Sequence, residues 1–406
     1  MEKKAMRKTV IAILTLAIAM GTIGENFTNK NVAFAEERSD YAVDTIVNLD
    51  NNLVVEDGVV MECKNKQITE VNLSNDIIGI ASDAFAECIN LKKVTMTNSV
   101  EFIGDNAFSV CPSLETVVLS GKLHDTEKIF GDYYSEHYNY KGIDVSFAEI
   151  DENSEENEQI LEFECHTPQI KSISVPDGYF ALDFDLSECI NLKSVTMTNS
   201  VEHLSPFAFA VCPSLETVVL SGKLHDTSDI FGDYYSEHFN YKGVDVSFAE
   251  IDFTVNKDIT DNILRFECHT PQIKSISVPD GYFALNFNLI GCTNLETITM
   301  TNSVEHLGIM DFGNCPNFKN IKISNKALQN VSNIVSHGEK IIGVSYDDMV
   351  KGDCNADGNV SVSDLVTLTS YMLSDKIEYI STGSDVNDDG VINVFDMIYL
   401  KSMLLS

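Results

Sequence analysis

The 406-residue chain contains no tryptophan and few positive charges. The missing indole weakens any model of a sugar-binding platform, because flat aromatic rings are the usual stacking surface for such ligands. Lysine and arginine number 27 against 62 aspartate and glutamate residues, for a formal charge of −35. Phosphate contacts dominate nucleic-acid affinity, and basic residues attract proteins to anionic lipid. This charge balance excludes nucleic acid and anionic membrane surfaces as partners.

Long hydrophobic runs are also lacking. The one apolar run near the start, Val10–Met20, is too short to span a bilayer. It follows a cluster of basic residues and precedes the small-x-small sequence Ala33-Phe34-Ala35. This is the pattern of a secretory signal peptide, here residues 1–35. We expect a secreted, extracellular protein with no membrane insertion, whose mature charge is about −38 because the leader carries five basic and two acidic residues.

Ten cysteines in an exported chain would normally suggest disulfides. Nine of them, however, recur in register with an internal repeat: Cys63, Cys88, Cys111, Cys165, Cys189, Cys212, Cys268, Cys292 and Cys315. Cysteines at one position of a stacked repeat behave as small buried apolar residues. We favour free buried thiols, with disulfides as the alternative. Cys354 lies outside the repeat, and we expect it to be exposed.

Internal repeats decide the fold of most of the chain. Three units of about 102 residues start at Cys63, Cys165 and Cys268, and each contains a shorter period of about 23–25 residues. The shorter period carries Leu-x-x-Val-x-Leu/Met, as in Leu91–Met96 and Leu114–Leu119. Each such run predicts one short strand, with its apolar side chains inward, that pairs in parallel with the next coil. We therefore predict an α/β solenoid of parallel short strands, shaped as a curved slab, over residues 36–349.

The combination of a cysteine, Leu-x-x-Val, Asn-Ser-Val and Ala-Phe before the next cysteine resembles the BspA-like leucine-rich repeats of bacterial surface proteins. The resemblance covers about Glu56 to Ser324. It implies an exposed strand face that binds a second protein or a glycan. By alternation along each strand, the candidates on that face are Lys92, Thr95, Glu115, Thr116, Lys193, Thr196, Glu216, Glu296 and Thr299.

Two segments depart from the repeat, residues 123–147 and 224–248, and each holds six aromatic residues and two histidines. One interpretation is a ligand patch made of Tyr133, Tyr134, His137, Tyr234, Tyr235 and His238. The other is a long coil whose aromatics pack into the solenoid core. The histidine spacing fits no compact zinc pattern. The pairs Cys165-His166 and Cys268-His269 are duplicated, and the two adjacent residues of a pair would point to opposite faces of a strand. Both facts argue against a cysteine nucleophile with a histidine base.

The last stretch repeats one spacing twice, from Asp353 to Asp364 and from Asp385 to Asp396. Acidic, amide or hydroxyl side chains occupy positions 1, 3, 5, 9 and 12, and glycine occupies position 6. Calcium takes about 6–8 oxygen ligands, and a loop can supply them only by turning sharply at position 6. An amphipathic segment follows each loop, and no helix precedes either one.

Two loop–helix units without entering helices resemble a type I dockerin, here residues 350–406: a small all-α module with two EF-hand-like loops. The resemblance implies two Ca²⁺ ions and a cohesin module of a scaffoldin as partner. Its ligands would be Asp353, Asn355, Asp357, Asn359 (backbone), Ser361 (through water) and Asp364, then Asp385, Asn387, Asp389, Val391 (backbone), Asn393 (through water) and Asp396. It places cohesin contacts at Val362, Ser363, Val394 and Phe395. Many members carry Ser-Thr at these positions, so we expect a cohesin of another specificity. Phe395 is either an apolar anchor or part of the module's own core.

Together these features predict a secreted, non-catalytic cellulosome component, with no catalytic constellation. Its dockerin would bind a cohesin in a calcium-dependent way, while the repeat domain binds a protein or a surface glycan. The alternative is a cellulosomal enzyme or enzyme inhibitor that acts on polysaccharide or protease through residues 123–147 and 224–248.

Overall fold

The computed structural model describes residues 52–123, 126, 128–131, 142–150, 159–165, 167–186, 189–232, 243–251, 262–336, 342–373 and 379–406. One compact unit, Asn48–Ser406, holds every element described below. The predicted signal peptide, residues 1–35, lies outside the described residues.

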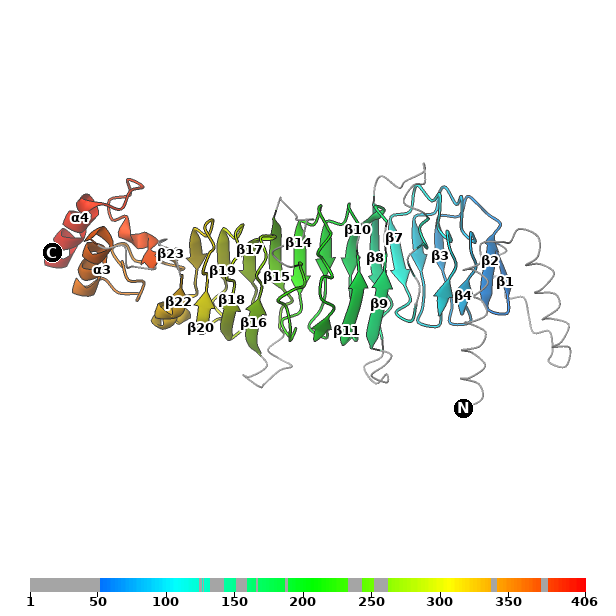
Figure 1. The fold of residues 1–406 in the computed structure, drawn as a ribbon, viewed down its shortest axis with the longest axis horizontal. Helices are drawn as coiled ribbons and strands as arrows, with labels where there is room; N and C mark the ends of the chain where they lie inside the picture. Colours follow the sequence, from blue (N-terminus) through cyan, green and yellow to red (C-terminus); the bar gives the residue numbers. More distant parts are fainter. Residues whose placement is uncertain are drawn as a thin grey trace. The chain divides into compact units, whose positions relative to one another are not determined.

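A thirteen-stranded parallel sheet runs through this unit (Figure 1). Each strand pairs with the strands before and after it in parallel register. In sheet order they are β3 (Glu70–Asn72), β5 (Lys93–Thr95), β7 (Thr116–Leu119), β8 (Ile143–Phe147), β10 (Ile170–Ser174), β12 (Ser194–Thr196), β14 (Thr217–Leu220), β15 (Val244–Phe248), β17 (Ile273–Val278), β19 (Thr297–Met300), β21 (Asn320–Lys322), β23 (Ile342–Ser345) and β24 (Tyr379–Ser381).

A second row of short strands forms three smaller sheets (Figure 1). The first sheet opens with the antiparallel pair β1–β2, and the remaining pairs are parallel. The strands are β1 (Leu53–Glu56), β2 (Val59–Cys63), β4 (Gly79–Ile80) and β6 (Phe102–Ile103); then β9 (Ile160–Glu164), β11 (Ala181–Asp185) and β13 (His203–Leu204); then β16 (Ile263–Glu267), β18 (Ala284–Asn288), β20 (His306–Asp311) and β22 (Ile334–Val335). The sequence patterns had predicted one strand per coil, so this second row is a finding of the structure.

One hydrophobic core joins the two rows of strands. One central residue of each of the first twelve strands of the large sheet, β3 to β23, points inward and is buried: Val71, Val94, Val117, Val145, Ile173, Val195, Val218, Val246, Ile276, Ile298, Ile321 and Val344. Each such side chain contributes roughly 1.5–3 kcal/mol on burial. A coil cannot bury these residues alone, so the solenoid is stable only as a stack.

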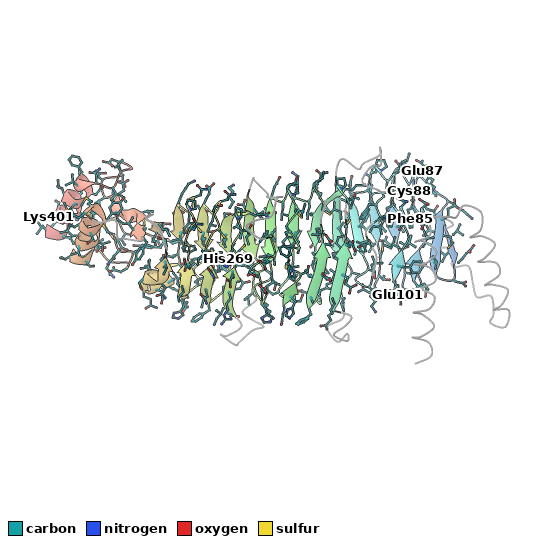
Figure 2. The ribbon with its side chains drawn as sticks, viewed as in Figure 1. Phe85, Glu87, Cys88, Glu101, His269 and Lys401 are labelled. Carbon is teal, nitrogen blue, oxygen red and sulfur yellow. The ribbon has the colours of Figure 1, made fainter. Side chains whose placement is uncertain are left out.

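The cysteines belong to this core. All ten are free and buried, and the prediction that Cys354 is exposed is wrong. Thiols donate along the stack, as from Cys189 Sγ to the Cys165 carbonyl at 2.8 Å and from Cys315 Sγ to the Leu289 carbonyl at 3.0 Å. Burial raises the pKa of the Cys315 thiol to about 11, so it remains protonated. Figure 2 shows Cys88 beside Phe85, whose ring stacks on Phe108 with centroids 5.3 Å apart.

Asparagines in the Asn-Ser-Val turns bridge distant coils. Asn98 accepts from the Gly121 amide at 2.8 Å and donates to the Glu149 carbonyl at 2.8 Å. The Tyr179 hydroxyl donates to the Ala148 carbonyl at 2.7 Å and fills the space over Gly121, where a Cβ would lie 1.9 Å from that oxygen. The second unit repeats the arrangement with Asn199, Gly222 and Tyr282.

The nine residues proposed for the exposed strand face are all exposed or half-buried. Three of them form ion pairs between coils: Lys193 with Glu216 at 3.2 Å, and Glu296 with Lys319 of the next coil at 2.9 Å. Exposed pairs of this kind contribute only about 0–1 kcal/mol each.

The chain ends in a small helical region. A 3₁₀ segment, η3 (Asn325–Asn333), precedes β22 and β23, and helices α3 (Val362–Leu373) and α4 (Val394–Leu405) follow, with η4 (Thr382–Ser384) between them. A separate core of Cys354, Leu368, Ile380, Val386 and Leu400 holds this region together. The predicted fold class, a parallel-strand leucine-rich-repeat solenoid followed by a small helical module, is confirmed. Within the part of the chain that the structure describes, no helix is long and apolar enough to cross a membrane.

Candidate calcium loops and docking surface

The first candidate loop, Asp353–Asp364, is closed by its own carboxylates. Asp353 Oδ1 accepts from the Asp357 amide at 3.1 Å, and its Oδ2 accepts from the Gly358 amide at 2.9 Å. Gly358 has a positive φ of 85°, which places the sharp turn where the spacing predicts it. Asp364 accepts from the Cys354, Asn355 and Ser361 amides at 2.7, 3.2 and 2.7 Å. The loop is therefore already wrapped around its oxygen atoms.

The second loop, Asp385–Asp396, repeats this network. Asp385 accepts from the Asp389 and Gly390 amides at 3.1 and 2.8 Å. Asp396 accepts from the Val386, Asn387 and Asn393 amides at 2.7, 3.2 and 2.8 Å. Asn393 also caps α4, since its side chain accepts from the Phe395 amide at 2.8 Å. The equivalent positions of both loops thus adopt one local geometry.

The remaining positions line the same turns. Asn355 Oδ1 accepts from the Asp357 amide, and Asp357 Oδ1 accepts from the Asn359 amide. Their counterparts Asn387, Asp389 and Val391 make the same two bonds. Ser361 donates toward Asp364 at 3.4 Å. All twelve predicted positions therefore lie in the two loops, six in each.

Buried charge makes these loops fit a cation. Asp353, Asp364 and Asp396 are fully buried, and none of them forms an ion pair with a described lysine, arginine or histidine. Burial raises the pKa of Asp353 against the effect of its hydrogen bonds, which is the mark of a carboxylate held away from water. An unpaired buried charge is costly, and hard oxygen ligands suit a calcium ion. Among the described residues, no three His, Cys, Asp or Glu side chains gather as a metal cluster, so the three aspartates predicted in each loop are not brought together as one. The other half of each predicted set consists of amide, hydroxyl and backbone oxygens.

Sequence reasoning missed two contacts of the first loop. The Tyr346 hydroxyl, from the end of the solenoid, donates to Asp353 Oδ2 at 2.6 Å. Burial and this bond raise the pKa of Tyr346 to about 12. Lys351 pairs with Asp388 and so connects the start of the module to the second loop. Neither contact has a local sequence signal, because Tyr346 and Lys351 lie outside the twelve-residue loop spacing.

The residues predicted for partner contact are exposed at the start of each helix. Val362 and Phe395 expose 67% and 59% of their surface, and Val394 exposes 49%. Ser363 is also exposed. Because Phe395 lies outside the module's core, the interpretation as an apolar anchor is favoured. On α4, Ile398 and Tyr399 continue the exposed apolar face by one helical turn. Lys401, labelled in Figure 2, lies on the same helix.

The aromatic ligand patch could not be placed. Tyr133, Tyr134, His137, Tyr234, Tyr235 and His238 lie outside the described residues, as does His166. His269 is described (Figure 2): its Nε2 lies 2.8 Å from Glu267 Oε1 and its Nδ1 2.8 Å from the Ile290 carbonyl. This histidine bridges two coils.

Two family models match the chain. The BspA type leucine-rich repeat region matches residues 61–175, 158–242 and 247–348 in six copies, and the dockerin type I domain matches residues 351–405. Both are non-catalytic modules that support protein–protein interaction of the cellulosome type. Proteins with these modules are typically extracellular or attached to the cell surface.

Solved structures of bacterial leucine-rich-repeat proteins are similar over the repeats. A leucine-rich cell surface protein from Faecalibacterium prausnitzii is 14% identical with a TM-score of 0.26, and the match covers 77% of this chain and 96% of that one. A leucine-rich-repeat protein from T. pallidum is 19% identical with a TM-score of 0.26, over 47% and 78%. One from Bacteroides ovatus is 20% identical with a TM-score of 0.24, over 77% and 78%. Comparison with curated proteins gave no match.

The repeat model covers more than half of the chain, and the stacked parallel strands with their buried cysteines and leucines are the structure it describes. The chain therefore belongs to the BspA type leucine-rich-repeat proteins and carries a type I dockerin domain after its repeats.

Proposed function

We propose that this protein is a secreted, non-catalytic component of a cellulosome-type assembly. Its dockerin binds a cohesin module of a scaffoldin in a calcium-dependent way, and its repeat domain holds a second protein or a surface glycan. The boundaries we propose are a signal peptide over 1–35, the solenoid over 36–349 and the dockerin over 350–406. The repeat face that carries Lys193 and Glu216 is the proposed surface for the second ligand.

Two Ca²⁺ ions are proposed, one in each loop, held by the twelve loop positions named above. When bound, calcium supplies the charge that neutralises the buried carboxylates. The chain's own residues do the rest: Asp364 and Asp396 fix the loop backbone to the first turn of each helix. In the first loop, Asp353 Oδ2 accepts two hydrogen bonds and Oδ1 accepts one, so Oδ1 is the oxygen with a lone pair left for an ion.

The observation that carries the docking proposal is the exposed apolar face at the start of α4. Val394, Phe395, Ile398 and Tyr399 each expose roughly half of their surface beside a loop. Contiguous exposed apolar side chains on a soluble protein mark interaction sites. A buried aromatic anchor typically dominates the energy of such an interface. We therefore assign Phe395 as the anchor.

Calorimetry of the full chain against a panel of cohesins, in calcium and in chelator, tests this. We expect Phe395→Asp to weaken binding at least about 30-fold, since an anchor contributes about 2 kcal/mol or more. The matched control is Ile309→Ser, which removes an apolar side chain that is 66% exposed on the solenoid; it should leave affinity unchanged. Calcium uptake with no cohesin bound, or equal loss in the control, would contradict the proposal.

A further inference from the structure

Strand β24 belongs to two cores at once. Tyr379 packs against the solenoid core, while its neighbour Ile380 is buried in the core of the dockerin. Adjacent residues of a strand point to opposite sides, so one strand serves both. β24 pairs in parallel with β23 through Ile342↔Tyr379, Gly343↔Ile380 and Val344↔Ser381. A dockerin segment is thus the last strand of the solenoid sheet.

Further contacts support the joint. Tyr346 donates to Asp353 and accepts from the Val350 amide at 3.0 Å. The Thr382 hydroxyl lies 3.0 Å from Met349 Sδ, and Met349 packs against the solenoid core. On the other side, Leu328 of η3 approaches the first loop so closely that a Cβ on Gly358 would lie 3.2 Å from Leu328 Cδ1.

The solenoid needs such a cover at this end. Without β24, strand β23 would be the edge of the sheet, with unpaired amide and carbonyl groups and an uncovered core beside it. Repeat proteins require terminal caps for this reason. At the other end of the solenoid, the β1–β2 hairpin forms the edge of the first of the three smaller sheets.

We propose that the dockerin has a second function: it is the C-terminal cap of the solenoid, and the stability of the last coils depends on it. This goes beyond docking, because it assigns β24, Tyr346 and Tyr379 a role inside the chain. Coupling of this kind is reciprocal, so the solenoid end also stabilises the first loop.

Hydrogen exchange of the full chain in calcium, read by mass spectrometry, tests the proposal. Tyr379→Ala removes the dockerin side chain that reaches the solenoid core and leaves Ile380 in place. We expect exchange in β21 and β23 to accelerate at least about tenfold, while β5 and β7 stay unchanged, because local openings follow local packing. The control is Leu373→Ser on α3, which is 81% exposed and should have no effect on β23.

A second, milder variant keeps the proposal testable if Tyr379→Ala unfolds the whole protein. Tyr346→Phe removes two hydrogen bonds at nearly constant volume, and we expect about threefold faster exchange in β23. Exchange in β23 within about twofold of the unsubstituted chain for both tyrosine variants, or equal acceleration in Leu373→Ser, would overturn the cap. Cohesin binding plays no part in this measurement, so its outcome is independent of the docking proposal.

Discussion

The two calcium loops share one spacing and one hydrogen-bond network, yet they lie in different surroundings. In the first loop, Asp353 is fully buried and accepts a hydrogen bond from the Tyr346 hydroxyl, and the loop packs against Leu328. In the second, Asp385 is half-buried and Gly390 has no atom within 4 Å of the position a Cβ would occupy. The spacing of the motif specifies the turn in both loops. The surrounding residues decide whether a loop packs against the end of the solenoid, as the first does, or is exposed, as the second is.

The largest difference should come from the buried carboxylates at position 12. Asp364→Ala and Asp396→Ala each leave three backbone amides without an acceptor, which should lower dockerin stability by about 3 kcal/mol. Only Asp364→Ala should also lower the protection of β23. Urea denaturation together with hydrogen exchange measures both effects. Equal loss of β23 protection in the two variants would remove the distinction between the loops.

A smaller effect is expected from the glycines at position 6. Both have φ above 80°, so alanine costs about 1 kcal/mol at either site. At Gly358 the new methyl group also meets Leu328, whereas Gly390 has open space. Gly358→Ala should therefore destabilise by roughly 0.5–1 kcal/mol more than Gly390→Ala, as measured by thermal unfolding in calcium. Equal costs at the two glycines would show that Leu328 moves aside freely, and a greater cost at Gly390 would contradict the prediction.

The smallest expected effect concerns His269 of the solenoid rather than either calcium loop. Burial opposes protonation of His269, but its hydrogen bonds to Glu267 and the Ile290 carbonyl outweigh it and raise the pKa. A raised pKa in the folded state gives stability that is present below the unfolded value of about 6.5 and is lost as pH rises through the folded value.

His269→Gln should therefore lower Tm by roughly 1–2 °C at pH 5.5 and by less at pH 8. Glu267→Gln serves as the control that removes the partner, and it should reduce the same pH dependence. The difference between the two calcium loops should be unaffected by either change. If the Tm of His269→Gln depended on pH as that of the unsubstituted chain does, His269 would not contribute to the pH dependence of stability.

The solenoid could be predicted from sequence because its signals are local and repeated. Leu91, Val94 and their equivalents recur at fixed spacing, and their burial follows from alternation along each strand. The second row of strands was missed. Elements such as β4 and β13 contain two residues each and have no periodicity to detect, but β9 and β11 contain five residues each with alternating burial, a local signal that could have predicted them.

The loops show the same limit. Twelve positions follow from spacing alone, but the burial of Cys354 depends on β24, which lies far along the chain: the Ser381 amide donates to the Cys354 carbonyl at 3.1 Å. From sequence alone, a loop position such as Cys354 is predicted to be exposed, because the distant segment that covers it is not known. The joint through Tyr379 and Tyr346 was hidden for the same reason.

The asparagine bridges differ between the first two units and the third. In the first two units, Gly121 and Gly222 make room for a tyrosine of the following unit. In the third unit the same position is Asn325, whose backbone amide still donates to the Asn302 side chain at 3.0 Å. Asn302 itself donates to the Asp347 side chain instead of to a backbone carbonyl. A fourth copy added by duplication would bring a tyrosine ring against a side chain where its predecessors met a hydrogen atom. We therefore expect the array to tolerate a further copy placed before its third unit, but not one placed after it.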